Sequence, residues 1–243
     1  MSQPGNANHS AYEYVGEELD LFALAVNWKQ YFRSHIADVI RGDVVEVGAG
    51  IGETTRHLCD GRQRSWLCLE PDAQLASRLE SSIARAELSP TPRVQVGTLA
   101  DVDAASRFDA ILYIDVLEHI EHDAEELRRA AALLGHGGCI VVLSPAFGLL
   151  YSEFDRAVGH FRRYTKRSLA AVFPTSLRRR QLRYLDGVGF LASLANRMLL
   201  HQSVPSRQQI ELWDRRMIPV SRHVDGVMQH FFGRSVLAVY ERA

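Results

Sequence analysis

Apolar residues follow two spacings along the chain, and each spacing predicts one kind of secondary structure. In residues 17–40 they recur every three or four positions, which is typical of a helix with one buried face. Residues 43–48 form a short, valine-rich run that stops at a glycine, as a fully buried strand does. The same patterns predict helices at 53–59, 72–86, 123–134 and 166–173, and strands at 65–70, 93–97, 108–116, 139–145, 178–185 and 234–242.

The order of these elements predicts the fold class. Strands joined by helical crossovers form a parallel sheet, so we expect an α/β protein with a doubly wound sheet and helices on both faces. The sheet core comprises residues 43–185 and 234–243. Residues 186–233 are helix-like and too long for a simple connection, which predicts a helical cap inserted before the last strand. Residues 17–243 would form a single domain, preceded by a flexible polar segment at 1–16.

Composition and charge exclude several classes of protein. Of the 243 residues, 47% are hydrophobic and 23% are charged, which is ordinary for a globular protein. The formal net charge of −1 argues against nucleic acid as a partner, and we identify neither a signal peptide nor an apolar run of membrane-spanning length. The three cysteines, Cys59, Cys68 and Cys139, have no paired spacing. They predict free thiols, and hence a cytoplasmic protein without a metal site.

The stretch DVVEVGAGIGETT, residues 43–55, places a glycine-rich turn directly after the first predicted strand. Such a turn binds a nucleotide-like ligand, and a dinucleotide requires the spacing G-x-G-x-x-G. Here the glycines alternate, and the place of the third glycine is taken by Glu53, whose carboxylate would repel a pyrophosphate. Glu46 precedes the turn, and a buried carboxylate there suits a cationic ligand group. The turn therefore favours S-adenosylmethionine (SAM), a sulfonium compound, over NAD.

A second acid supports the same ligand. Glu70 ends the second predicted strand, where a carboxylate accepts hydrogen bonds from a ribose diol in open α/β sheets. NAD and SAM both carry that diol, so Glu70 favours SAM only together with Glu46 and the glycine spacing. A single acid at a strand end is commonly a solvated loop residue, and the combination of three features argues against that alternative.

Four stretches resemble successive motifs of the class I SAM-dependent methyltransferases. They are VVEVGAGIGETT, LEPD, GTLADV and FDAILYIDVLEHIEHDAEELRRAAALLGHGGCIVVLSP. The resemblance is to a bacterial small-molecule subgroup (methyltransferase type 11 or 12), and it implies a seven-stranded sheet with a reversed last strand. It also implies contacts with the cofactor. SAM would be cradled by Glu46, Gly48, Ala49, Gly50 and Gly52, and its ribose would be held by Glu70. The adenine would lie beside Pro71, Leu99 and Ala100, and the methionine end would contact Asp115 and Val116.

Candidate catalytic side chains follow the fourth and fifth predicted strands. Methyl transfer is an in-line displacement, so the enzyme must align the acceptor and, for oxygen or nitrogen, remove a proton. His119 fits either a general base or a structural histidine, and His160 and Tyr164 in the later loop are further candidates. Tyr151 and Arg163 of that loop are candidate substrate contacts, because a guanidinium binds a carboxylate or phosphate with two hydrogen bonds.

Each of these interpretations has a structural alternative. In the loop, Asp155, Arg162 and Arg163 could instead form an ion-pair brace. Trp28 and Trp213 predict apolar walls around an acceptor, while the alternative is a cap that packs only on the sheet or on a second subunit. Residues 156–183 carry nine basic residues and no acid, which indicates either an anionic partner, such as an acceptor or an acidic membrane surface, or a solvated face.

Together these features predict a SAM-dependent methyltransferase that acts on oxygen or nitrogen of a small-molecule or lipid-like acceptor, with an anionic group as one alternative. Two other hypotheses remain at this point. One is a NAD-dependent oxidoreductase, and the other is a methyltransferase-like module that binds a membrane or a partner without catalysis. No oligomeric state is predicted.

Overall fold

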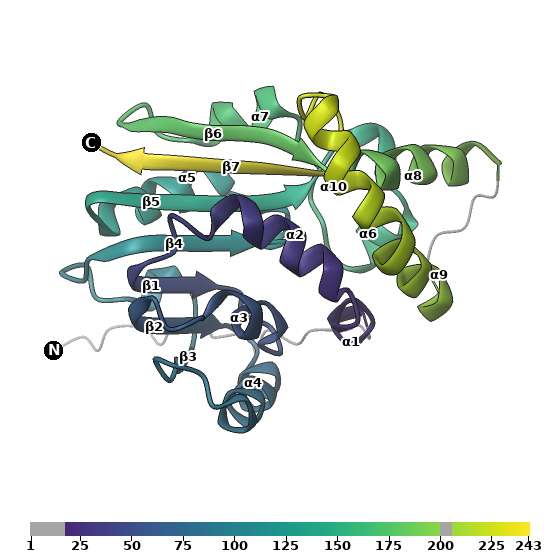
Figure 1. Ribbon diagram of the computed structural model, residues 1–243. Coiled ribbons are helices and arrows are strands. Elements are labelled where there is room, and N and C mark those ends of the chain that lie inside the picture. Colours follow the sequence, from purple (N-terminus) through teal and green to yellow (C-terminus); the bar gives the residue numbers. More distant parts are fainter. Residues whose placement is uncertain (1–17, 200–205) are drawn as a thin grey trace, which may run out of the picture.

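A sheet of seven strands runs through the centre of the structure (Figure 1). The structure is a computed structural model that describes residues 18–199 and 206–243, so the segment at 1–16 that we expected to be flexible lies outside the described residues. β7 runs antiparallel to both of its neighbours, and all other strand pairs are parallel, which confirms the predicted class and the reversed last strand. In spatial order the strands are β3 (Arg93–Val96), β2 (Gln63–Glu70), β1 (Gly42–Val47), β4 (Phe108–Ile114), β5 (Leu134–Pro145), β7 (Ser235–Arg242) and β6 (Leu177–Leu185).

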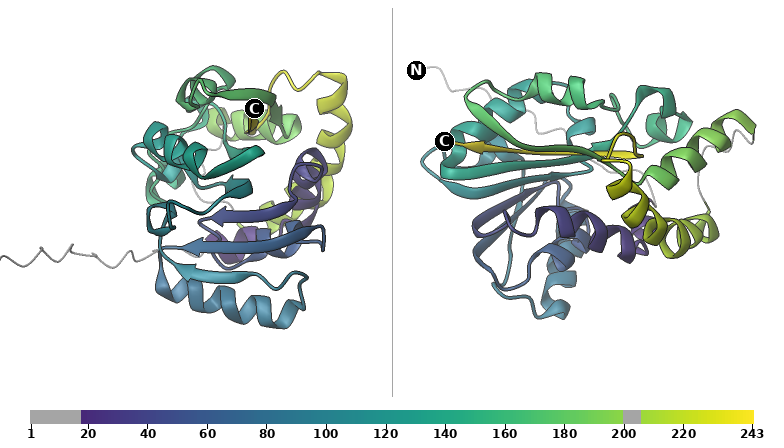
Figure 2. Two further views of the ribbon diagram at one scale, coloured as in Figure 1. Left: turned by 90° about the vertical axis from the view of Figure 1, so that its left-hand side faces the viewer. Right: turned by 45° about the horizontal axis from the view of Figure 1, so that its top comes forward.

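The sheet has an apolar core on each face, because successive side chains of a strand point to opposite sides. Val44 of β1 belongs to one core and Val45 belongs to the other, and both are fully buried. Helices cover both faces, as expected for a doubly wound sheet (Figure 2). The first core includes residues of α2 (Val26–Ile36), α3 (Glu53–Leu58) and α4 (Ala73–Ala86), and the second includes residues of α5 (Asp123–Leu133) and α7 (Lys166–Val172).

The single helix predicted at 17–40 is wrong in its extent, because the chain forms two helices there. α1 (Glu18–Ala23) ends before α2 begins at Val26. The buried ammonium of Lys29 donates a hydrogen bond to the Phe22 carbonyl at the end of α1 (2.7 Å). The carboxylate of Asp214 accepts a hydrogen bond from the Trp28 amide in the first turn of α2 (2.8 Å). Both polar contacts satisfy helix ends that would otherwise be unpaired.

The segment between β6 and β7 is helical and lies beyond the carboxyl ends of β1, β4 and β5, beside α2 (Figure 1). Residues 200–205 of this segment lie outside the described residues. Asp225 accepts a hydrogen bond from the Tyr31 hydroxyl (2.7 Å), which connects the segment to α2. Its helices are α8 (Gly187–Leu199), α9 (Arg207–Leu212), the π-helical η4 (Trp213–Met217) and α10 (Ile218–Val227).

Several boundaries differ from the prediction. β5 begins at Leu134 rather than at 139, because Leu134 pairs with Phe108 across an irregularity in the β4–β5 register. The pattern did not predict four short helices: η1 (Leu99–Asp101), η2 (Leu117–His119), η3 (Gly148–Leu150) and α6 (Glu153–Ala157). Among the described residues, no helix is both long and apolar enough to cross a membrane.

Candidate active site

A cavity opens at the carboxyl ends of β1 and β4, where ligands bind in open α/β sheets. The glycine turn forms one side of it through Gly48, Ala49 and Gly50. The opposite side comes from elements far away in sequence. It consists of Trp28, Lys29, Asp115, Glu118, His119, His160, Arg163, Trp213 and Arg234, among others.

Two of the glycines are required by close packing. Gly48 has φ +65°, and a Cβ atom there would lie 2.8 Å from Cγ2 of Val116. Gly52 has φ +86°, and its Cβ would lie 2.5 Å from Cδ1 of Leu79 on α4. Residues with side chains rarely adopt such backbone conformations, so glycine allows both the turn and its contacts with α4 and with the segment that follows β4. Gly50 lines the cavity directly.

Glu70 connects the glycine turn to the end of β2. Its Oε2 accepts a hydrogen bond from the Gly50 amide (2.8 Å), and its Oε1 accepts one from the Asp72 amide (3.0 Å). Burial raises the pKa of this carboxyl. Both oxygens keep further lone pairs, so the geometry is compatible with the predicted contact to a ribose diol.

Glu46 lies buried beneath the glycine turn. Its side chain is 2% exposed and does not line the cavity. Oε2 accepts hydrogen bonds from the Thr55 hydroxyl (2.7 Å) and from the Trp66 indole (3.1 Å), and burial raises the pKa to about 7. Glu46 therefore supports the turn from below, and its predicted interaction with a cationic ligand group, directly or through water, stays a prediction.

The residues expected near the adenine and the methionine lie around the same edge of the sheet. Leu99 is buried in the second core, and Ala100 beside it is exposed. Pro71, Leu99, Ala100 and Val116 do not line the cavity, so their cofactor contacts stay predictions. Asp115 does line it, at φ +54°, a conformation that is uncommon for a residue other than glycine.

His119 and His160 lie side by side in the cavity, with ring centroids 4.6 Å apart and nearly perpendicular planes. Burial and the neighbouring His160 lower the pKa of His119 to about 4, so this ring is neutral at pH 7. His160 Nδ1 is 2.8 Å from Oδ1 of Asp155. Both candidate catalytic histidines are therefore at the cavity, where the prediction places them.

The loop after β5 forms the brace that we considered as an alternative. Arg163 lines the cavity but donates two hydrogen bonds to Asp155 (Nε–Oδ1 2.7 Å, Nη2–Oδ2 2.9 Å). Its guanidinium is thus already paired with a carboxylate, which argues against the predicted contact with a substrate anion. Arg162 is paired with a different carboxylate, through one hydrogen bond from Nη1 to Oδ2 of Asp123 (2.7 Å).

Tyr151 and Tyr164 do not line the cavity. Tyr164 is 2% exposed, belongs to the core on the opposite face of the sheet, and donates its hydroxyl hydrogen to Asp123 (2.7 Å). Tyr151 donates to the His160 carbonyl (2.6 Å). The predicted catalytic role of Tyr164 and the predicted substrate contact of Tyr151 gain no support from this placement and stay predictions, while both side chains fix the loop.

The predicted aromatic wall is present. Trp28 and Trp213 both line the cavity, and their ring centroids are 5.9 Å apart. The Trp213 indole donates to Asp186 Oδ2 (2.7 Å), which fixes its orientation. Phe22 contacts Trp213 with a ring separation of 6.4 Å and extends the apolar surface.

The polar residues of the cavity that the sequence prediction lacks include Lys29, Glu118 and Arg234. The guanidinium of Arg234 lies 4.9 Å from the centroid of the Trp213 ring, and within the described residues it has no ion pair or hydrogen bond. The reversed direction of β7 brings this position to the carboxyl edge, since Arg234 directly precedes the strand. The reversed last strand, which the family resemblance implies, is therefore the sequence signal that could have identified Arg234 as a cavity residue.

Most basic residues of the 156–183 segment have partners. Arg178 pairs with Glu241, and Arg180 pairs with Asp38 (2.6 Å). Lys166 donates to the His230 carbonyl (2.7 Å). These contacts favour the solvated, charge-balanced face over a continuous anion-binding surface.

Comparisons with known proteins agree with this geometry. Residues 45–140 match the model of a family described as a methyltransferase domain. No curated protein matches the chain. A SAM-dependent methyltransferase from Clostridium acetobutylicum superposes with a TM-score of 0.57 at 11% identity, covering 90% of this chain and 92% of the other.

Two further solved structures are similar. Coclaurine N-methyltransferase bound to N-methylheliamine and SAH superposes with a TM-score of 0.61 at 13% identity, covering 90% of this chain and 72% of the other. The N-methyltransferase NodS from Bradyrhizobium japonicum with S-adenosylhomocysteine gives 0.54 at 13% identity, covering 88% and 84%.

The family match, the strand order and the glycine turn define the class of this protein. Residues 45–140 carry a methyltransferase domain, the whole chain has the fold of SAM-dependent methyltransferases, and SAM is the methyl donor. The match also decides between the two ligands considered for the turn, in favour of SAM over NAD.

Proposed function

We propose that the protein transfers a methyl group from SAM to oxygen or nitrogen of a small or lipid-like acceptor that carries an anionic group. The observation behind the anionic group is Arg234. Its guanidinium faces the cavity beside Trp213 without an ion-pair partner among the described residues. An unpaired guanidinium can bind a carboxylate or phosphate with two hydrogen bonds.

The cavity supports a division into a donor side and an acceptor side. SAM supplies a methyl group that is activated by its sulfonium charge. On the donor side, the backbone of Gly48 and Gly50 allows close approach, and Glu70 would bind the ribose diol. On the acceptor side, His119 and His160 would contact the nucleophilic group.

Trp28 and Trp213 would bind the apolar part of the acceptor and exclude water, which aligns the two reactants. The helical segment that carries Trp213 would thereby act as a cap. Its position beyond the carboxyl ends of the strands supports this role (Figure 1).

The proposal extends to the surroundings of the protein. The free, buried thiols of Cys59, Cys68 and Cys139 support a cytoplasmic location. Peripheral contact with an anionic membrane receives less support, because several basic residues of the 156–183 segment are paired.

The acceptor proposal is tested with pairs of compounds that differ only in charge, such as a carboxylate and its methyl ester. We expect the parent to form S-adenosylhomocysteine faster with the anion, and Arg234→Gln to reduce that preference by about 10- to 100-fold through loss of a charged hydrogen bond. Arg216→Gln, at an exposed position outside the cavity lining, is the matched control. Equal rates with both members of each pair in the parent would overturn the proposal.

A further inference from the structure

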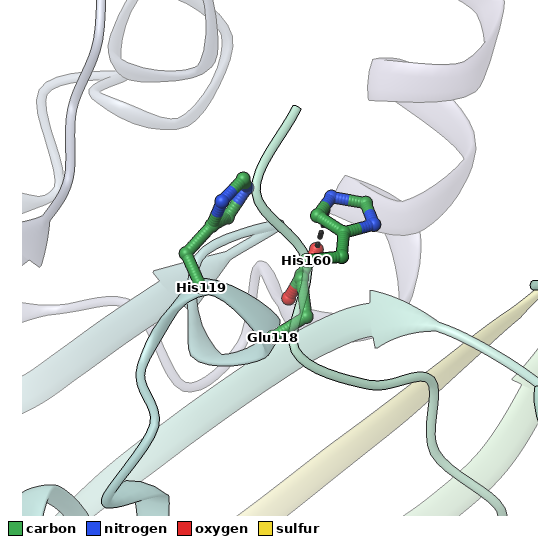
Figure 3. Close-up of side chains that lie close together, drawn as sticks. All are labelled: Glu118, His119 and His160. Atoms are coloured by element: carbon green, nitrogen blue, oxygen red, sulfur yellow. Dashed lines mark ion pairs between the residues drawn. The ribbon is translucent and has the colours of Figure 1, made fainter. Parts of the chain in front are cut away.

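Glu118, His119 and His160 bring one carboxylate and two imidazoles to the acceptor side of the cavity (Figure 3). The nearest ligand-capable atoms of the three residues all lie within 4.8 Å of one another. Two ligand atoms bound to one zinc-like ion at about 2.1 Å are at most about 4.2 Å apart. Small side-chain adjustments would therefore bring all three atoms onto one ion.

Glu118 supplies an independent sign of a ligand. Its side chain is 0% exposed. Oε2 accepts a hydrogen bond from the Ser144 hydroxyl (2.7 Å), but Oε1 has no hydrogen-bond partner among the described residues. A buried carboxylate oxygen without a hydrogen bond costs folding free energy. A cation or a hydrogen-bond donor bound beside Oε1 would remove this cost.

His160 is oriented toward the same point. Its Nδ1 is 2.8 Å from the Asp155 carboxylate, which assigns the proton to Nδ1 and leaves a lone pair on Nε2. Nε2 lies 3.9 Å from Oε1 of Glu118, too far for a hydrogen bond and a suitable separation for two ligands of one ion.

Asp155 is itself held firmly by other groups. Arg163 binds both of its oxygens, and Ser152 donates from its amide and its hydroxyl (2.8 and 2.9 Å). A carboxylate that fixes a histidine in this way is the usual outer support of a metal-binding imidazole. The pair of Asp155 and Arg163 described above would therefore orient His160 as well as stabilise the loop.

The surrounding charges are compatible with a cation. Asp115 also lines the cavity and adds a second carboxyl group to its wall. The charge of Arg163 is balanced by Asp155, while Lys29 and Arg234 are the other cations in the lining.

We propose that Glu118, His119 and His160 bind a divalent transition-metal ion such as Zn²⁺, Mn²⁺ or Co²⁺, which holds the acceptor hydroxyl for methylation. Two imidazoles with a carboxylate suit these ions better than Ca²⁺ or Mg²⁺. This differs from the sequence prediction, which expected no metal. The three ligands come from η2 and from the loop after α6, segments far apart in the chain, so no local spacing indicates them.

The catalytic part rests on the proposed methyl transfer and selects oxygen over nitrogen. A bound divalent ion lowers the pKa of a coordinated hydroxyl, so its proton leaves to water. The oxygen lone pair forms the new C–O bond, and the electron pair of the broken C–S bond stays on sulfur, which becomes neutral. His119 and His160 then act on the acceptor through the ion.

The test is calorimetric titration of the chelator-treated full chain with Zn²⁺, Mn²⁺ and Co²⁺. We expect one ion per chain, and at least tenfold weaker binding in Glu118→Gln, His119→Gln and His160→Gln. His136→Gln, at an exposed position on β5, should bind like the parent. Asp155→Asn, a positioning variant, should weaken metal binding by about 10- to 100-fold.

Two further measurements separate the possible failures. Thermal unfolding of each variant, with and without metal, shows whether it folds, and only variants that retain His160, Glu118 and His119 should gain stability from the ion. S-adenosylhomocysteine binding is measured in parallel. If the protein binds S-adenosylhomocysteine but no metal ion, this inference alone is overturned. If it binds the metal ion but not S-adenosylhomocysteine, the proposed function is overturned. Equal metal affinity in all variants would also overturn the site.

Discussion

Glu46 lies under the glycine turn with its carboxyl group fully enclosed. It accepts hydrogen bonds from Thr55 and Trp66, but burial outweighs them and raises its pKa from 4.5 to about 7. A carboxyl with a raised pKa stabilises the fold while it is protonated. That contribution is complete below the unfolded pKa and is lost as the pH rises through the folded pKa.

We therefore predict that the free energy of unfolding of the parent, relative to Glu46→Gln, falls by at most about 3 kcal/mol between pH 4.5 and pH 8. The amide keeps the shape and one acceptor oxygen, and it does not titrate. Urea unfolding of both proteins across this range measures the difference. A difference that is independent of pH would show that Glu46 has an ordinary pKa.

Glu70 permits a test of the cofactor side. Glu70→Gln keeps the size of the side chain but loses the charge that would accept the ribose hydroxyls, so S-adenosylhomocysteine should bind about 10- to 100-fold more weakly. Glu80→Gln, on the exposed face of α4, is the control and should bind like the parent. Undiminished affinity in Glu70→Gln, measured by calorimetry, would remove Glu70 from the binding site.

Among the secondary-structure elements, the start of α2 depends on a residue from a distant part of the chain. Asp214 of η4 accepts hydrogen bonds from the amide and the side chain of Asn27 (3.1 and 2.9 Å) and from the Trp28 amide. It therefore performs the role of an N-cap from 187 positions away. The apolar period of residues 17–40 contains no sign of this break, which explains why one helix was predicted.

We predict that Asp214→Ala lowers the free energy of unfolding by about 1–3 kcal/mol, because the buried amides at the start of α2 lose their acceptor. Asp20→Ala removes an exposed carboxylate from α1 and should change stability by less than about 0.5 kcal/mol. Denaturant unfolding curves measure both variants. Equal losses of unfolding free energy in the two variants would mean that the N-cap contact of Asp214 contributes nothing specific to stability.

For the whole molecule, the periodic pattern and the local motifs predicted the doubly wound parallel sheet and the glycine turn. The acceptor side was harder, because its residues converge from separate segments. Trp28 and His119 lie in recognisable stretches, but Arg234 reaches the cavity only because β7 is reversed. Glu118 looks like a surface acid in the sequence, and only the packing of Ser144 and His160 around it shows that it is buried.

The position of β7 also affects how the protein can be made. β7 lies between β5 and β6, yet the ribosome synthesises it after every other strand. Until then, β5 and β6 have exposed edges with unpaired backbone groups, which are prone to pair with other chains. The sheet of the nascent chain therefore stays incomplete between β5 and β6 until residues 235–242 have emerged from the ribosome.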